Sequence, residues 1–287
     1  MMLASTMATM TGPRLRVRQL PTAHDWLAAT ESLRGTDPVL MNVPGSIAES
    51  VAAGAVYDDE LWLAVLEDDG VVGCAVRTAP WPAVVGPMPH EAARLLGRWI
   101  QENAGPLEGV IGPADTVASM SSGGGCSLQV RMREVVRVLQ TPISPSPCAG
   151  SIRSATPADV PLLAQWFVDF HQEAKLPVAA REDQVLRAVH DERLWVWQDG
   201  VPVAMGGHAR VVSTPGGTVG RIGPIYTVPG RRKQGDASAL THDIAMRLTR
   251  SCDIVMLIAD ADNSASNSIY ERLGFEVAAE LVEAGLA

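Results

Sequence analysis

The sequence has few cysteines, an excess of negative charge and no long apolar run. Its four cysteines are widely spaced and form no C-x-x-C pair, so the usual spacing of a zinc site is absent and we expect no metal. A net charge of −9 argues against nucleic acid as a partner. No apolar run approaches the ~20 residues that span a bilayer, and residues 1–13 lack the pattern of a signal peptide. We therefore expect a cytoplasmic protein that does not contact membranes.

The length and apolar content predict two domains joined by a linker. The chain has 287 residues, of which 47% are hydrophobic, and a typical domain has about 150 residues. Residues 141–150 contain three prolines, two serines and a glycine, which extend neither a helix nor a sheet. We therefore predict domains over residues 14–140 and 151–287, with 141–150 as the linker.

Hydrophobic periodicity and turn residues predict a mixed α/β domain after the linker. Thr156, Pro157 and Asp159 form a helix-start signal, and the apolar run Ile254 to Ala259 is typical of a strand buried on both faces. The predicted elements are a helix to about residue 170, a helix over 181–190, strands over 194–198, 201–212 and 219–228, a helix over 235–250, a strand over 254–259, a helix over 264–273 and a strand over 275–282.

The first half of the chain echoes the second. The helix-start signal at residues 22–25 resembles that at residues 156–159, and the segment 60–70 resembles 192–200, each ending in Asp-Gly. In both pairs of similar segments, the second segment follows the first by a similar number of residues, which predicts an internal duplication. The alternative is an unrelated α/β domain in the first half.

The most informative segment is Gly223 to Leu240, where an apolar strand enters a basic turn and an amphipathic helix leaves it. The first N–H groups of a helix lack partners within the helix and bind anions together with the helix dipole. Gly235 and Ala237 allow a phosphate group to approach the backbone, and Arg231 to Lys233 add positive charge. Taken alone, a solvated surface turn would explain these residues as well.

Two motifs make the second half similar to the GNAT acetyltransferase superfamily. The spacing Arg232-x-x-Gly235-x-Ala237 resembles that family's coenzyme A loop, R/Q-x-x-G-x-G/A. The segment from Asn263 to Phe275 resembles its closing signature, N-x-x-[AS]-x-x-x-Y-x-x-x-G-F. Both motifs occur in the family's order and context. The first half matches neither and would be a degenerate second GNAT-like domain.

The resemblance implies tandem GNAT-like α/β domains, each a mixed, mostly antiparallel sheet flanked by helices, with a parallel strand pair splayed at the cofactor site. It implies an N-acetyltransferase that moves an acetyl group from acetyl-CoA to a small-molecule or peptide amine, with Tyr270 protonating the departing thiolate. The oligomeric state, acyl-chain length and acceptor stay open. The implied cofactor-binding residues are Ile225, Tyr226, Thr227, Arg231, Arg232, Lys233, Gln234, Gly235, Asp236, Ala237, Ser238, Asn263 and Ser266.

Some features depart from the family pattern or leave the chemistry open. Asp236 places an acid inside the phosphate loop, and we expect its side chain to point to solvent. The general base is not identified by the sequence, although Asp169, Glu173 and His208 are candidates. Residues 83–96, where a loop of the first half would fall, lack the Arg-x-x-Gly-x-Gly pattern. A protein that binds acyl-CoA without transferring the acyl group, as a sensor or regulatory subunit, is therefore the alternative.

Overall fold

The computed structural model describes residues 15–286 apart from residues 58, 106, 125–127, 175 and 177–179. Residues 1–13, which lack the pattern of a signal peptide, lie outside the described residues. No helix in the described part of the chain is long and apolar enough to cross a membrane.

Both halves have nearly the same order of elements: a strand, helices, a group of strands, a helix, a strand, a helix and a last strand. The group has three strands in the first half and four in the second. This order confirms the predicted mixed α/β class and agrees with an internal duplication. The elements of the first half are β1 Leu15–Leu20, α1 Ala23–Ala29, α2 Glu31–Thr36, α3 Asn42–Ala52, β2 Glu60–Glu67, β3 Gly70–Thr78, β4 Ala83–Val85, α4 His90–Asn103, β5 Val110–Pro113, α5 Ala114–Gly124 and β6 Leu128–Leu139.

The second half follows the predicted order with two differences. A strand, β7, precedes the first helix, and the strand expected over residues 201–212 is divided into β9 and β10. The elements are β7 Ser151–Ser154, α6 Val160–Ala174, α7 Glu182–His190, β8 Leu194–Asp199, β9 Val201–His208, β10 Val212–Thr214, β11 Gly217–Thr227, α8 Asp236–Leu248, β12 Ile254–Asp260, α9 Ser264–Arg272 and β13 Phe275–Leu286.

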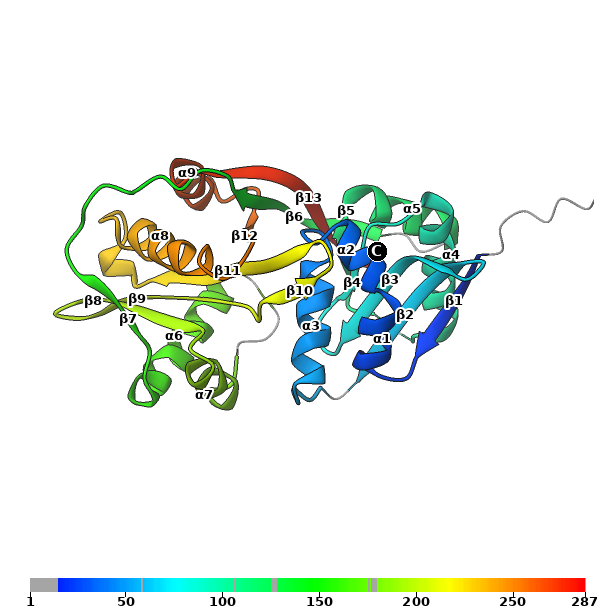
Figure 1. The fold of residues 1–287 in the computed structure, drawn as a ribbon, viewed down its shortest axis with the longest axis horizontal. Coiled ribbons are helices and arrows are strands. Elements are labelled where there is room, and N and C mark those ends of the chain that lie inside the picture. The colour runs from blue at the N-terminus through cyan, green and yellow to red at the C-terminus, as the bar shows by residue number, and fades with distance from the viewer. Residues whose placement is uncertain are drawn as a thin grey trace, which may run out of the picture.

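All the described strands belong to one sheet that runs through both halves (Figure 1). Its order is β1-β2-β3-β4-β5-β13-β6-β12-β11-β9-β8-β7, with β10 paired to β11. The pairs are antiparallel except β4 with β5 and β11 with β12. Each half therefore contributes one parallel pair to a mostly antiparallel sheet, as the fold class predicted.

The two halves exchange their last strands. Strand β6 ends the first half in the chain but lies beside β12 of the second half, where Val138 is opposite Met256. Strand β13 ends the second half but pairs with β5, where Val282 is opposite Gly112. The exchanged strands also pair with each other. The sheet of each half is thus completed by a strand from the other, which the sequence analysis did not anticipate.

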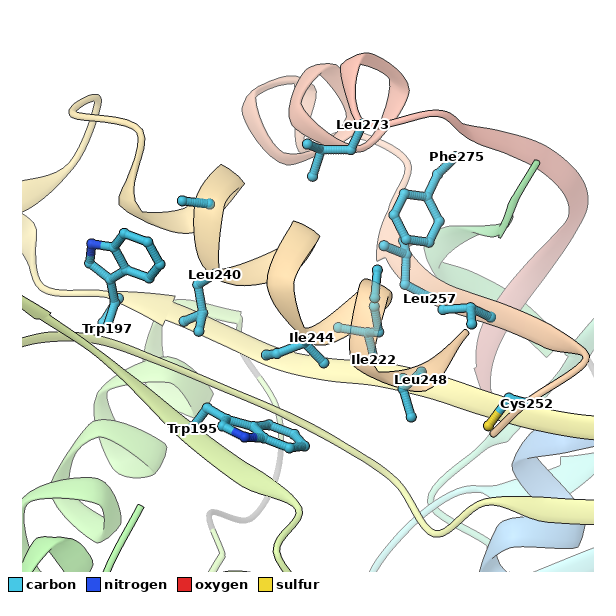
Figure 2. Packing of buried hydrophobic residues seen from close by; sticks show 14 of the residues in the cluster. Trp195, Trp197, Ile222, Leu240, Ile244, Leu248, Cys252, Leu257, Leu273 and Phe275 are labelled. Carbon is cyan, nitrogen blue, oxygen red and sulfur yellow. The ribbon is translucent and has the colours of Figure 1, made fainter. Parts of the chain in front are cut away.

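Helix α8 packs on β11 and its antiparallel neighbour β9, beside the parallel pair of the second half (Figure 2). Leu240, Ile244 and Leu248 point from the helix toward the sheet, where Ile222 of β11 and Leu257 of β12 lie in the same buried cluster. The spacing of three or four residues places these helix side chains on one face. This packing fixes the start of α8 relative to β11.

A polar contact joins the opposite face of β11 to the first half. The Arg221 guanidinium donates from Nε to Asn42 Oδ1 at 2.9 Å and from Nη2 to Ser46 Oγ at 3.1 Å. Both partners are on α3 and are buried. Val39 packs against the neighbouring buried cluster, which includes Val219. The first half therefore covers one face of the strand that leads to the phosphate loop.

We expect Val282→Pro to destabilise both halves together, because proline removes a ladder donor from a strand that is paired on both sides. Val282→Ala keeps the backbone donor and removes only part of a buried side chain, so its effect should be smaller. Denaturant unfolding followed by circular dichroism measures the difference. Equal midpoints for the two variants would show that the exchanged strand is dispensable.

Candidate active site

The parallel strands of the second half separate where the cofactor is expected. Ile222 and Leu257 form their last paired position. Beyond it, β11 continues to Thr227 paired with β9, whereas β12 continues to Asp260 paired with β6. The two strands thus diverge from a common vertex, and the opening between them holds no backbone pairing.

The predicted phosphate loop lies at the end of β11 and at the start of α8. Gly235 has a φ of 97°, in the left-handed region that favours glycine, and no side chain caps the helix at this residue. The N–H groups of the first turn have no intrahelical acceptors, and in proteins generally such groups bind anions together with the helix dipole. Gln234, Ala237 and Ser238 belong to the same turn.

The arginines of this loop already have carboxylate partners. Arg231 contacts Asp199 at 2.8 Å and Asp236 at 3.3 Å, and these two acids raise the pKa of its guanidinium. Arg232 Nη2 lies 2.7 and 2.8 Å from the two carboxylate oxygens of Glu173. Within the described residues, no ion pair involves Lys233. Two of the three predicted cations are therefore paired with carboxylates of the protein itself.

Arg232 is further fixed by two contacts with β11. Its Nε donates to the Thr227 carbonyl at 3.1 Å, and its guanidinium lies over the Tyr226 ring, 5.8 Å from the centroid. Tyr226 in turn packs against Trp166 of α6, with ring centroids 6.1 Å apart. Arg232 and the Tyr226 side chain therefore brace the end of β11 against α6.

The expectation that Asp236 points to solvent is wrong. Its side chain is 1% exposed, and one carboxylate oxygen faces Arg231 while Oδ1 has no hydrogen-bond partner. The position explains the burial, because a carboxylate in the first turn is stabilised by the helix dipole and here also by a neighbouring guanidinium. Asp236 thus supports the loop from its buried side by pairing with Arg231.

The start of α9 is held by two asparagines. Asn263 Oδ1 accepts from the Ser266 N–H at 3.1 Å and caps the helix, as its sequence position allowed. Asn267 Nδ2 donates to the carbonyls of Asp260 and Asn263 at 2.8 and 3.0 Å. Sequence reasoning missed Asn267, whose place inside the closing motif was its only signal. It ties the helix to the end of β12.

Tyr270 lies on α9 where it faces the core beside the parallel pair. It packs on the cluster beneath α8, and its ring is 6.3 Å from that of Phe275. Burial raises the pKa of its phenol, and a hydrogen bond with Ser266 opposes that shift. The hydroxyl therefore stays protonated at neutral pH and can donate a proton.

The three candidate bases have different environments. Asp169 accepts a hydrogen bond from Gln165 at 2.9 Å on the exposed face of α6, and Glu173 is engaged by Arg232. His208 ends β9 opposite Ile222, the vertex residue, and its Nδ1 lies 2.5 Å from the Ala209 carbonyl. This contact assigns the proton to Nδ1 and leaves Nε2 as an acceptor. Burial lowers the pKa of His208, so the ring is neutral at pH 7.

His208 also lines a cleft of about 640 Å³ between the two halves. Asp191 Oδ2 in this cleft accepts from Arg193 at 3.1 Å and from Arg210 at 3.0 Å. The other residues lining the cleft are His24, Glu49, Ala52, Ala53 and Val211. The cleft is thus polar and reaches the end of the strand beside the vertex.

Comparison with known proteins agrees with this arrangement. The family model described as FR47-like protein matches residues 211–282, which contain the splayed strands, the loop and α9. An acetyltransferase of the GNAT family from Colwellia psychrerythraea is 11% identical over 95% of this chain and 100% of its own, with a TM-score of 0.61. A tandem GNAT protein from the clavulanic acid biosynthesis pathway is 13% identical over 94% and 98%, with a TM-score of 0.59.

This chain has a tandem GNAT fold. A GCN5-related N-acetyltransferase from Sphaerobacter thermophilus shares it, at 18% identity over 96% of each chain and a TM-score of 0.59. No curated protein sequence matches the chain. At these identities the likeness concerns the fold, and the resemblance read from the two motifs is confirmed at that level.

The first GNAT-like half lacks the corresponding site. Pro89 stands at the N-cap of α4, where the second half has Gly235, and another proline, Pro87, precedes it. Proline carries no N–H, so this turn offers fewer donors to an anion. A Cβ on Gly112 would lie 2.8 Å from the Val85 carbonyl oxygen, so β4 and β5 stay in close contact to their ends. Among the described residues, no group of three His, Cys, Asp or Glu could hold a metal ion in either half.

We expect Gly235→Val to abolish binding of coenzyme A, because a β-branched residue cannot adopt the φ of 97° without strain. Gly230→Ala is the matched control, since a Cβ there meets nothing within 4 Å. Isothermal titration with coenzyme A measures both. Retained binding in the valine variant would place the ligand outside this loop.

Proposed function

We propose that this protein transfers an acetyl group from acetyl-CoA to an amine by direct attack. The observation that carries the proposal is the separation of β11 from β12 beyond Ile222 and Leu257, beside the uncapped start of α8. An opening in the sheet accommodates an extended chain, and the helix start accommodates its diphosphate. The FR47-like match covers the same elements.

The residues present fit acetyl-CoA as a co-substrate. The N–H groups of Gln234, Gly235 and Ala237 would hold the diphosphate, with Ser238 and Lys233 at its sides. Backbone groups of Ile225 and Thr227 would hold the pantetheine arm and the acyl carbonyl. The capped start of α9, at Asn263 and Ser266, would border the arm from the β12 side. Arg231, Arg232 and Asp236 support the loop, since their side chains have internal partners.

The proposed reaction joins the cleft to the splayed strands. A neutral amine nitrogen attacks the thioester carbonyl, and a backbone N–H stabilises the charge that develops on oxygen. Tyr270 gives its proton to the departing sulfur. The Nε2 atom of His208 accepts the proton from the amine, directly or through a water molecule. His208 is suited to this role because it lies on β9 opposite the vertex residue Ile222 and lines the cleft.

A second function fits one observation. Because Arg231 and Arg232 are held by carboxylates, the loop offers less free positive charge than its sequence indicates. A protein that only senses acyl-CoA with weak affinity would need no more positive charge than this. Release of free coenzyme A thiol that depends on an added amine distinguishes the two functions.

We expect Tyr270→Phe to lower the turnover of acetyl-CoA with a responsive amine by roughly 10²-fold or more, the usual size of a lost proton donor. The affinity for coenzyme A should change little, since the ring and its packing remain. Tyr57→Phe, in the other half, is the control. Thiol release gives the rate and titration gives the affinity. No amine-dependent release from the unsubstituted protein, across a panel of amines, would leave the sensor function.

We expect the rate to fall as the pH drops through the His208 pKa, which lies below 6.5 because burial disfavours the charged ring. The neutral form is the proton acceptor, so activity is present above that pKa and lost below it. His208→Gln should lower the rate and remove this acidic limb. His24→Gln, in the same cleft, should leave the limb in place. An unchanged pH profile in His208→Gln would exclude His208 as the base.

A further inference from the structure

The linker between the halves is fixed to the second half at both of its ends. At its start, the Gln140 N–H donates to the Gly274 carbonyl at 3.0 Å, and the Ile143 N–H donates to the Leu273 carbonyl at 3.1 Å. These contacts hold it against the end of α9. Figure 1 shows the linker leaving β6, passing α9 and the near end of α8, and descending to β7.

Its other end lies on the phosphate loop. Trp197 Nε1 donates to the Ala149 carbonyl at 2.9 Å. A Cβ built on Gly235 would lie 3.2 Å from the Cβ of Cys148 and 3.7 Å from its sulfur. Cys148 is half-buried here, and burial together with the charge of Asp236 raises the pKa of its thiol. We call residues 143–149 the strap.

The strap therefore bridges the two helix ends that border the proposed site. Prolines at positions 145 and 147 remove backbone donors and restrict its conformations, so it keeps an extended course between its anchors. Next to Cys148, the start of α8 has no side-chain cap, so its first N–H groups lack partners. Donors of this kind beside the strap indicate that an anionic ligand completes this region.

We propose that the strap is the outer wall of the acyl-CoA site, and that a bound diphosphate lies against Cys148. The inference rests on the proposed function, because it takes the ligand to be an acyl-CoA. It adds a segment outside both GNAT motifs to the site, and one that belongs to this chain's linker. A ligand on the Gly235 to Ala237 N–H groups contacts Cys148 because that side chain lies beside Gly235, close enough to meet a Cβ built there.

Alkylation of Cys148 tests the strap in the unsubstituted protein. The protein is treated with iodoacetamide with and without acetyl-CoA, whose thioester leaves no free thiol to react, and peptide mass spectrometry follows each cysteine separately. At ten times the dissociation constant we expect Cys148 to react about tenfold more slowly, since only the unliganded fraction is accessible. Buried Cys252 in the same half serves as the internal reference.

A parallel titration calorimetry experiment separates the failure of the two proposals. Binding of acetyl-CoA with unchanged or faster alkylation of Cys148 would overturn the strap and leave the proposed function standing. Absence of binding would overturn both. Cys148→Trp should weaken acetyl-CoA binding by about tenfold or more through overlap with the ligand, whereas Cys148→Ser should bind normally. Circular dichroism establishes that each variant is folded.

Discussion

The antiparallel pairing of β6 with β13 is the interaction on which the rest of the structure depends. It joins two sheets into one and places each half's last strand in the other half. Strand β12 is consequently held on one side by β6, which comes from the first half. The separation of β11 from β12 needs a fixed partner on each outer flank, β9 for one and β6 for the other. The opening in the second half therefore depends on the first half, although the first half lacks the loop that would bind an anion.

The two parallel pairs show how one fold can keep an opening or close it. In the second half, β11 and β12 diverge, and a glycine with positive φ begins α8. In the first half, Gly112 lies against Val85, and Pro89 stands at the start of α4. Pro89 lacks the N–H donor that an anion needs. Gly112 has no Cβ, and this allows β4 and β5 to lie close together. The same residue type, glycine, thus serves ligand approach in one half and close packing in the other.

The sequence allowed good predictions of features set by neighbours in the chain. The turn at Gly235, the cap at Asn263 and the buried strand at Ile254 depend on local patterns, and all three are found. The strand exchange could not be predicted, because the apolar alternation of β6 and β13 fits either sheet equally well. The partners of Arg232 and Asp236 could not be predicted from the sequence either. Glu173 is 59 positions from Arg232, and the burial of Asp236 follows from tertiary packing around Arg231.

The ion pairs of the loop suggest why its arginines are there. A guanidinium already bound to carboxylates contributes less to an incoming anion, and an exposed pair such as Arg232 with Glu173 adds little stability. The two arginines instead fix the position of the loop. Arg231 connects the start of α8 to the β8–β9 hairpin through Asp199. Arg232 connects the end of β11 to α6 through Glu173. Both ends of the loop are thereby fixed before any ligand arrives. A loop held in this way loses little conformational entropy on binding, so its backbone N–H groups can serve as the main ligands of a diphosphate.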